Sequence, residues 1–256
     1  MHIALISDIH ANLPALQATL EAINSYAPGA IYCLGDLVGY GPYPNEVIET
    51  IRKHTIPTLA GNYDYAIGRN SNDCGCAYKN EEEKTWGQNS IAYTNAAITA
   101  PNRQYLLRLP SQIQLVFHEE KHTYKILLVH GSPRKINEYL YEDRPENSFL
   151  RLLQQADCNI LLCGHTHLPY YKKLWDPTTQ SYRYIINVGS VGKPKDGNPQ
   201  ACFVILNLDN WQKIIFDGAL SIEFVRTPYD VEKIAQAIEQ EPSLPNVYAQ
   251  MLRKGQ

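Results

Sequence analysis

Residues 2–16 read HIALISDIHANLPAL. The apolar run at its start fits a buried strand, and Asn12 before Leu-Pro is typical of a helix start with an N-cap and an early proline. Asp8 and His10 stand at the junction, two residues apart, and alternation in an extended chain puts such a pair on the same side. The stretch therefore predicts a strand that ends in a carboxylate and an imidazole and passes directly into a helix.

The same rhythm continues along the first quarter of the chain. Residues 30–34 and 56–60 are further short apolar runs, and residues 45–54 form a helical pattern introduced by the turn-rich GYGPYP. Strand, helix, strand, helix, strand implies right-handed crossovers and a parallel sheet.

Residues 65–110 break this rhythm. The segment is polar at first and becomes helical from residue 80, with a short helix predicted over 102–109. We expect a mostly helical insertion over one end of the sheet, since lids on active sites are commonly built in this way.

The remainder of the chain is dominated by apolar, strand-like runs. A helix is predicted over 145–156 and a last helix from residue 229, and the strands are predicted over 113–117, 124–130, 159–163, 170–174, 182–187, 201–208, 212–216 and 222–226. This order predicts an α/β protein with two packed sheets and helices outside them, built as a single domain of residues 1–256.

The composition limits the class of protein. Hydrophobic residues make up 44% of the 256 residues and charged residues 19%, which is enough for a buried core and argues against global disorder. Lys and Arg total 23 and Asp and Glu total 26, for a net charge of -3, so long nucleic acids are not expected as partners. No run approaches the length of a membrane span, and the first apolar stretch is too short for a signal peptide. We expect a cytoplasmic protein without membrane contact.

The six cysteines are expected to be thiols in that compartment. Cys33, Cys158, Cys163 and Cys202 lie in or beside apolar runs, as small buried hydrophobic residues do. The pair at 74 and 76 stands in the polar segment NSNDCGCAY. It could bind metal or respond to oxidation, but two thiolates do not complete a tetrahedral site, and a local packing role is favoured.

Further polar residues follow other predicted strands. They are Asp36 in CLGDLVGYG, Asn62 in LAGNYD, His130 in LLVHGS, and His165 and His167 in CGHTH. The carboxyl ends of strands in α/β sheets are where ligand sites collect, so these residues can converge with Asp8 and His10. Two Asp, four His and one Asn are enough donors for two divalent transition-metal ions with a bridging carboxylate.

Each short motif taken alone also has an ordinary structural explanation. A strand-end Asp is often a helix cap, and Asn62 after a glycine could simply tolerate a left-handed turn. Five such motifs in order, each after an apolar run, are difficult to explain in this way. The other histidines lack this context and are expected at the surface or in packing: His2, His54, His118 and His122.

In these motifs the chain resembles the calcineurin-like metallophosphoesterase superfamily, and more closely its small prokaryotic phosphodiesterase-like (YfcE-type) branch. The matching order is D-x-H, G-D, G-N-x-D, V-H-G and G-H-T-H, and it spans more than half of the chain. The resemblance implies a four-layer α/β/β/α sandwich of two mixed sheets, which agrees with the predicted element order.

The resemblance also assigns metal ligands. The first ion would be held by Asp8, His10, Asp36 and His167. The second would be held by Asp36, Asn62, His130 and His165, with Asp36 bridging the two ions. Members of the family use Mn, Fe, Zn or Ni, and the ligand types do not choose among these.

The implied reaction is hydrolysis of a small phosphodiester, or of a monoester. Metal ions about 3.5–4 Å apart bind a bridging water and lower its pKa, and the resulting hydroxide attacks phosphorus in line. Asn62 would stabilise charge on the phosphoryl oxygens, and Asp64 would position its loop.

The sequence departs from the family at the residue after Asn62. The wider superfamily has G-N-H-[DE], and its His is thought to protonate the leaving group, whereas this chain has Tyr63. A phenol with a pKa of ~10 is a poor acid at neutral pH. We therefore expect weak acid assistance and a preference for good leaving groups such as aryl oxygens.

A glycine-rich segment, NVGSVGKPKDG, is the candidate for substrate binding. Ser190, Lys193 and Lys195 would contact a substrate phosphate there, or the segment is simply a sheet corner with solvated lysines. Two other functions remain open: a non-enzymatic protein-interaction module on the same fold, and a nuclease for short oligonucleotides. The sequence also leaves open whether the chain forms a homo-oligomer.

Overall fold

The first strand is buried on both faces. In β1 (His2–Ile6), Ile3 and Leu5 point into one hydrophobic cluster, and Ala4 and Ile6 point into another. The alternation of a strand sends successive side chains to opposite faces, so β1 must lie between two layers. This is the central feature of the computed structural model, which describes residues 1–119 and 122–256.

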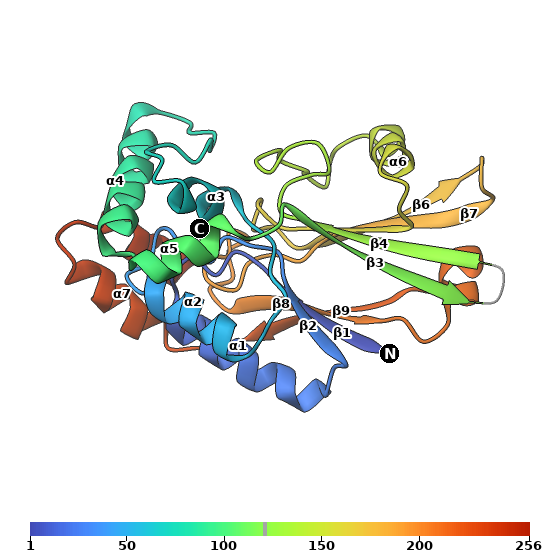
Figure 1. Ribbon diagram of the computed structural model, residues 1–256, viewed down its shortest axis with the longest axis horizontal. Helices are drawn as coiled ribbons and strands as arrows, with labels where there is room; N and C mark the ends of the chain where they lie inside the picture. Colours follow the sequence, from blue (N-terminus) through green and yellow to red (C-terminus); the bar gives the residue numbers. More distant parts are fainter. Residues whose placement is uncertain (120–121) are drawn as a thin grey trace.

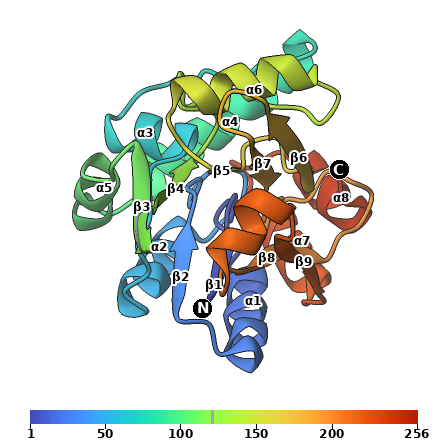
Figure 2. The ribbon, with the colours of Figure 1, turned by 90° about the vertical axis from the view of Figure 1, so that its right-hand side faces the viewer.

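Two mixed sheets stack face to face (Figures 1 and 2). The first has the order β2-β1-β8-β9, built from β2 (Ala30–Cys33), β1, β8 (Ala201–Asn207) and β9 (Ser221–Thr227). The second has the order β3-β4-β5-β7-β6, built from β3 (Gln112–Glu119), β4 (His122–Val129), β5 (Ile160–Cys163), β7 (Ser181–Asn187) and β6 (Tyr170–Asp176). Strands β1 and β2 are parallel, as are β4, β5 and β7.

Helices cover the outer faces of this pair of sheets. Figure 2 shows α6 (Glu146–Gln155) over the second sheet and α1 (Leu13–Tyr26) and α2 (Pro44–Lys53) on the side of the first. Helix α1 begins as predicted, because the side chain of Asn12 accepts a hydrogen bond from the backbone of Ala15. The α/β/β/α architecture expected from the sequence is confirmed.

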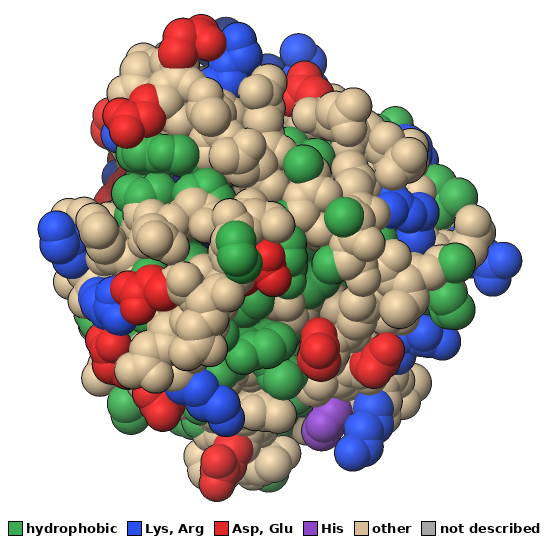
Figure 3. Space-filling view, turned by 90° about the vertical axis from the view of Figure 1, so that its left-hand side faces the viewer, with side chains coloured by type: hydrophobic (Ala, Val, Ile, Leu, Met, Phe, Trp, Pro, Cys, Tyr) green, Lys and Arg blue, Asp and Glu red, His purple; other side chains and the backbone are tan. Residues whose placement is uncertain are grey.

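One end of the molecule is helical (Figure 1). Helices α3 (Asn62–Gly68), α4 (Glu81–Ala97) and α5 (Ala100–Leu107) lie there, next to α7 (Val231–Glu239). Helix α8 (Val247–Lys254) packs against α7 (Figure 2). On this face acidic and basic side chains are interspersed (Figure 3). No helix in the described parts of the chain is both long and apolar enough to cross a membrane.

Two predicted strands are wrong. The run 56–60 contributes only a single parallel bridge, between Cys33 and Thr58, and then leads into α3. The run 212–216 lies in a short π-helix, η1 (Lys213–Asp217), whose first turn is capped by the side chain of Asn210. Ile214 and Ile215 of this helix are both buried and pack in the cluster between the sheets. Helix α8 was not predicted.

Candidate active site

The seven predicted metal ligands lie together beyond the carboxyl ends of β1, β2, β4 and β5, with Asn62 at the first turn of α3. Strands β1 and β2 belong to one sheet and β4 and β5 to the other, so the site stands where the two sheets meet. Every one of these side chains is buried, and none is more than 4% exposed: Asp8, His10, Asp36, Asn62, His130, His165 and His167.

The ligands form two adjoining groups. Asp8, His10 and His167 make the first, and Asp36, His130 and His165 make the second, with donor atoms within 4.8 Å of one another in each group. Asp36 connects them, because its Oδ2 lies 3.7 Å from His10 Nε2 and 3.3 Å from His130 Nε2. Asn62 joins the second group, with Oδ1 3.1 Å from His130 Nε2.

Three of the imidazoles are oriented by backbone carbonyls. The Nδ1 atoms of His10, His130 and His167 contact the carbonyl oxygens of residues 38, 34 and 193 at 3.0, 2.8 and 2.5 Å. A proton on each Nδ1 leaves Nε2 with its lone pair facing the centre, which is the usual arrangement of metal-binding histidines. The Nε2 atoms of His10 and His167 are only 3.2 Å apart, so two lone pairs face each other.

These donors fit divalent cations. Asp8 Oδ1 and His165 Nε2 are buried and have no hydrogen-bond partner among the described residues. Buried polar atoms without a partner are costly, and a cation would satisfy both. Mixed imidazole, carboxylate and amide donors suit Mn, Fe, Zn or Ni ions.

Burial and mutual charge shift the pKa values of these residues in opposite directions. Burial raises the pKa of Asp8, but the nearby His167 and His130 hold it well below its usual range. Burial lowers the pKa of His130, yet Asp36 and Asp8 raise it to about 10. Burial and the charge of His130 lower the pKa of His165 to about 2, and burial with Lys195 lowers that of His167 to about 4.

The backbone at the site is strained. Five ligands adopt left-handed conformations, with φ of 52° at Asp8, 50° at His10, 53° at Asp36, 66° at His165 and 62° at His167. Such conformations cost about 1–3 kcal/mol each for residues other than glycine, and they cluster at functional sites. They persist because the loops interlock: the Asp8 amide donates to the carbonyl of Gly35, and the His10 amide to that of Asp36, both at 2.9 Å.

Close packing between ligand loops explains one of the motif glycines. A Cβ on Gly61 would lie 2.0 Å from Asp36 Oδ1, so no side chain fits. The Tyr63 amide donates to that same Oδ1 at 2.8 Å, which leaves Oδ2 free to face His10 and His130. The G-N-x-D motif thus holds the Asp36 carboxylate in place as well as supplying Asn62.

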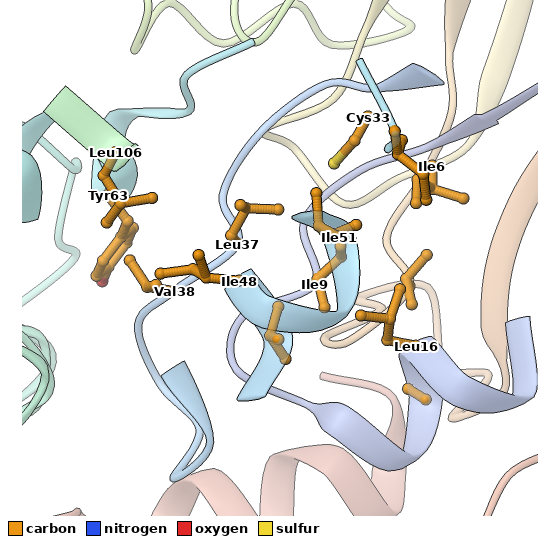
Figure 4. Close-up of a cluster of buried hydrophobic side chains, with 14 of the residues drawn as sticks. Ile6, Ile9, Leu16, Cys33, Leu37, Val38, Ile48, Ile51, Tyr63 and Leu106 are labelled. Atoms are coloured by element: carbon orange, nitrogen blue, oxygen red, sulfur yellow. The ribbon is translucent and has the colours of Figure 1, made fainter. Parts of the chain in front are cut away.

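Asp64 and Tyr63 have different surroundings. Asp64 is buried and accepts hydrogen bonds from the amides of Leu37 and Gly61 at 2.9 and 3.0 Å, so it joins the Asp36 loop to α3. Burial and the charge of Asp36 raise the pKa of Asp64 to about 7. The Tyr63 ring lies in the core cluster with Val38 and Leu106 (Figure 4). Burial and Tyr40 raise the pKa of Tyr63 well above its ordinary value.

The three predicted substrate-binding residues lie in one loop, but their side chains have different contacts and exposure. The Ser190 hydroxyl donates to the carbonyl of Asp8 at 2.7 Å and accepts from the Lys193 amide at 2.8 Å, so it supports the loop. The Lys193 ammonium is buried and donates to the backbone oxygen of Gln256 at 2.9 Å. Lys195 is exposed, and its charge lowers the pKa of His167.

Sequence reasoning missed three residues that contact the site. Cys76 accepts a hydrogen bond from the Asn62 amide at 3.2 Å, the Tyr139 ring lies 4.1 Å from that of His165, and the Tyr40 ring lies 4.8 Å from that of His10. The C-x-C pattern was a usable signal for Cys76. The two tyrosines carry no sequence signal, because their positions depend on how the loops pack.

The chain was compared with known proteins. The model of the calcineurin-like phosphoesterase superfamily domain matches residues 1–211. The uncharacterized protein MJ0912 of Methanocaldococcus jannaschii is 33% identical over 250 residues, which cover 92% of this chain and 91% of that protein. Phosphodiesterase YfcE of Escherichia coli K12 is 28% identical over 209 residues, covering 78% and 84%.

Solved structures agree with these sequence matches. A metallophosphoesterase from Sphaerobacter thermophilus superposes with a TM-score of 0.73 and 29% identity, covering 100% of this chain and 99% of that one. A hypothetical protein, PH1004 from Pyrococcus horikoshii, superposes with a TM-score of 0.78 at 24% identity, covering 100% and 98%, and shows the likeness of the fold. With this extent of match and the donor set described above, the chain belongs to the calcineurin-like phosphoesterase superfamily and is a metal-dependent phosphoester hydrolase.

Proposed function

We propose that the protein hydrolyses small phosphodiesters with the help of two divalent cations. Asp8, His10, Asp36 and His167 would hold the first, and Asp36, Asn62, His130 and His165 the second. The observation that carries the proposal is the position of Asp36 Oδ2, within 3.7 Å of one imidazole from each group. A carboxylate so placed can serve two cations at once.

Such cations, when bound, supply positive charge beside the phosphoryl group and lower the pKa of a water molecule. The protein's own residues would hold these cations and orient the side chains around them. Asp8 Oδ2 accepts from the Ser7 hydroxyl at 2.6 Å and from the His165 amide at 3.0 Å, so its other oxygen is fixed toward the first group. The Asn62 side chain is not free to donate to a phosphoryl oxygen in this conformation, because its Nδ2 donates to the carbonyl oxygen of Cys74 and to the sulfur of Cys76. Manganese is the cation we would test first.

On the substrate side, Lys195 is the best candidate for contact with a phosphate. It is exposed and close enough for its charge to act on His165 and His167. Lys193 and Ser190 would act by shaping the loop that carries it, since both side chains are engaged within the protein. The net charge of -3 likewise suits a small substrate rather than a long nucleic acid.

Two tyrosines close to the candidate ligands are poor proton donors, and this limits the substrates. Tyr63 is buried with a raised pKa, and burial also raises the pKa of Tyr139. Neither phenol would readily give up a proton near neutral pH. We infer a preference for esters whose leaving oxygen needs little protonation, such as aryl phosphodiesters.

We further propose that residues 1–256 act as one catalytic domain, with residues 65–110 covering the site. Asn62 contacts Cys74 and Cys76 from this segment, at 3.0 and 3.2 Å. The segment therefore closes one side of the second metal group.

The test is hydrolysis of an aryl phosphodiester by metal-free protein to which Mn²⁺ is restored. His165→Ala should lose the second Mn²⁺ and at least about a hundredfold in rate, because a metal supplies several kcal/mol of charge stabilisation. His54→Ala, at an exposed position, is the matched control and should behave as the parent. Full activity in His165→Ala would refute the assigned site. A parent that binds two ions but hydrolyses no phosphoester in a broad panel would favour an interaction module.

A further inference from the structure

The segment Cys74-Gly75-Cys76 lies directly against the second metal group. Gly75 has a φ of +69°, which folds the segment back on itself, and the sulfur of Cys74 lies 3.1 Å from that of Cys76. Cys74 is buried and Cys76 is partly exposed. All six cysteines are free thiols, but these two form a pair.

This pair takes up both hydrogens of the Asn62 amide. Asn62 Nδ2 donates to the carbonyl oxygen of Cys74 at 3.0 Å and to the sulfur of Cys76 at 3.2 Å. The amide is therefore prevented from rotating by 180°, and its Oδ1 is left facing His130 Nε2 at 3.1 Å. Only the oxygen of an amide is a metal ligand, so the orientation of Asn62 matters for the second cation.

The segment is held in place from its other side as well. The Asn137 side chain donates to the carbonyl of Gly75 at 2.8 Å, and the Gly75 amide donates to the carboxylate of Asp73 at 2.8 Å. The Ala77 amide donates to the hydroxyl of Tyr139 at 3.4 Å. These contacts fix the backbone on both sides of the thiols, so a change at the sulfurs is passed to Asn62 rather than absorbed by the loop.

We propose that Cys74 and Cys76 are positioning residues for Asn62, and that their oxidation to a disulfide weakens the second metal site. The inference rests on the proposed two-metal function. A disulfide bond requires the sulfurs to approach from 3.1 Å to about 2.05 Å. This approach moves the sulfur of Cys76 toward Cys74. It also replaces the Cys76 thiol, which accepts a hydrogen bond from Asn62 Nδ2, with a disulfide sulfur.

The oxidation step needs a two-electron oxidant, and hydrogen peroxide is sufficient. One thiol is oxidised to a sulfenic acid with release of water, and the other thiol attacks that sulfur and releases a second water. The sulfur–sulfur bond forms, the oxygen–oxygen bond of the peroxide breaks, and two electrons pass from the thiols to the peroxide. Of the two, Cys76 is the more exposed residue, and peroxide is small enough to approach from that side.

The positioning role is tested by Mn²⁺ titration of metal-free protein, with stoichiometry and affinity as the readouts. Cys76→Ala should weaken the second site by about 10–100-fold and leave the first unchanged, as loss of a supporting contact to a metal ligand does. Cys76→Ser restores an acceptor and should recover most of the affinity. Cys158→Ala, which removes a buried thiol outside the site, is the control.

The oxidation is tested on the same metal-free protein. Peroxide should remove two of the six thiols, lower Mn²⁺ binding from two ions to one, and be reversed by dithiothreitol. Cys76→Ser should bind two ions before and after peroxide. Two tightly bound ions in Cys76→Ala, or in protein shown by mass spectrometry to carry the Cys74–Cys76 disulfide, would overturn the inference. A parent that never binds two ions would instead overturn the proposed function.

Discussion

Tyr63 stands where the resemblance to the family leads us to expect a histidine, and its environment explains what the tyrosine does. Its ring packs between Gly39 and the core. The contact with Gly39 is so close that a Cβ there would lie 2.4 Å from the ring. It also meets the His10 ring edge-on at 5.5 Å. The phenol thus serves to pack α3 against the loop of the first metal group.

We predict that Tyr63→Phe keeps kcat for aryl phosphodiesters within about threefold of the parent, because a phenol of raised pKa contributes little as an acid. Rates across substituted phenyl phosphodiesters should fall steeply as the leaving phenol becomes more basic, and equally so in both proteins. A flat dependence in the parent would contradict the prediction, and a large loss of rate in the variant would identify Tyr63 as the proton donor.

Six of the seven candidate ligands could be placed from the sequence because they follow a strand within four residues. Asn62 follows the run at 56–60, which forms only a single bridge. The substrate residues could not be placed in this way. Ser190 and Lys193 stand in a loop that suggests phosphate binding, but their partners are Asp8 and Gln256, distant in sequence. Likewise, nothing local to Cys76 indicates that Asn62 contacts it. Partners supplied by distant segments are outside the reach of local patterns.

At the scale of elements, strands that alternate or are buried throughout were predictable, and short apolar runs were not. The run at 212–216 has strand-like composition, yet it forms η1, where the hydroxyl of Tyr184 donates to the carbonyl of Ile214 at 2.6 Å. The run at 56–60 ends as a connection because Asn62 must start a helix beside the Asp36 loop. Short apolar runs are compatible with both structures until tertiary packing decides.

The hairpin of β6 and β7 is fastened to α6 by one buried carboxylate. Asp176 accepts from Arg183 Nε at 2.7 Å, from Gln154 Nε2 at 3.0 Å and from the Thr178 hydroxyl at 2.6 Å. Burial raises the pKa of Asp176, but the hydrogen bonds from Thr178 and Arg183 hold it well below its usual range. The folded state therefore favours the ionised form of the Asp176 carboxylate.

We predict that Asp176→Asn lowers the free energy of unfolding by about 3 kcal/mol near neutral pH, since it leaves a buried guanidinium unpaired. A lowered pKa gives stability that is present above the unfolded pKa of ~3.9 and is lost as the pH falls below it. The difference between parent and variant in urea unfolding should thus be constant above about pH 5 and shrink toward pH 3.

Glu81→Gln, a carboxylate-to-amide change at an exposed ion pair of α4, is the control for Asp176→Asn. Its partner Lys84 is at 3.3 Å, but the side chain of Glu81 is 88% exposed, so its removal should have almost no effect. An Asp176→Asn difference that did not shrink in acid would mean that the carboxylate contributes by packing and not by its charge.

At the scale of the whole molecule, the site joins the two sheets. Asp8, His10 and Asp36 come from loops of the first sheet, and His130, His165 and His167 from loops of the second. Each of the two ligand groups draws on both sheets. The α/β/β/α architecture was predictable from the order of elements, but this division of ligands follows from how the sheets stack.

A site that spans two sheets should stabilise the whole fold when it is filled. Folding has to overcome the left-handed backbone at five candidate ligands and the buried atoms of Asp8 and His165 that have no hydrogen-bond partner among the described residues. Cations that bind only the folded state would offset this cost in free energy. At 100 times its dissociation constant, each ion adds about 2.7 kcal/mol, so two add about 5. For a chain of this length, Mn²⁺ should raise Tm by about 10–20 °C over metal-free protein.

Asp36→Asn, which weakens the carboxylate shared by both groups, should lose more than half of that shift, whereas His165→Ala should lose only the part due to the second ion. Equal residual shifts in the two variants, measured by scanning calorimetry at matched Mn²⁺, would show that Asp36 serves one ion and does not bridge.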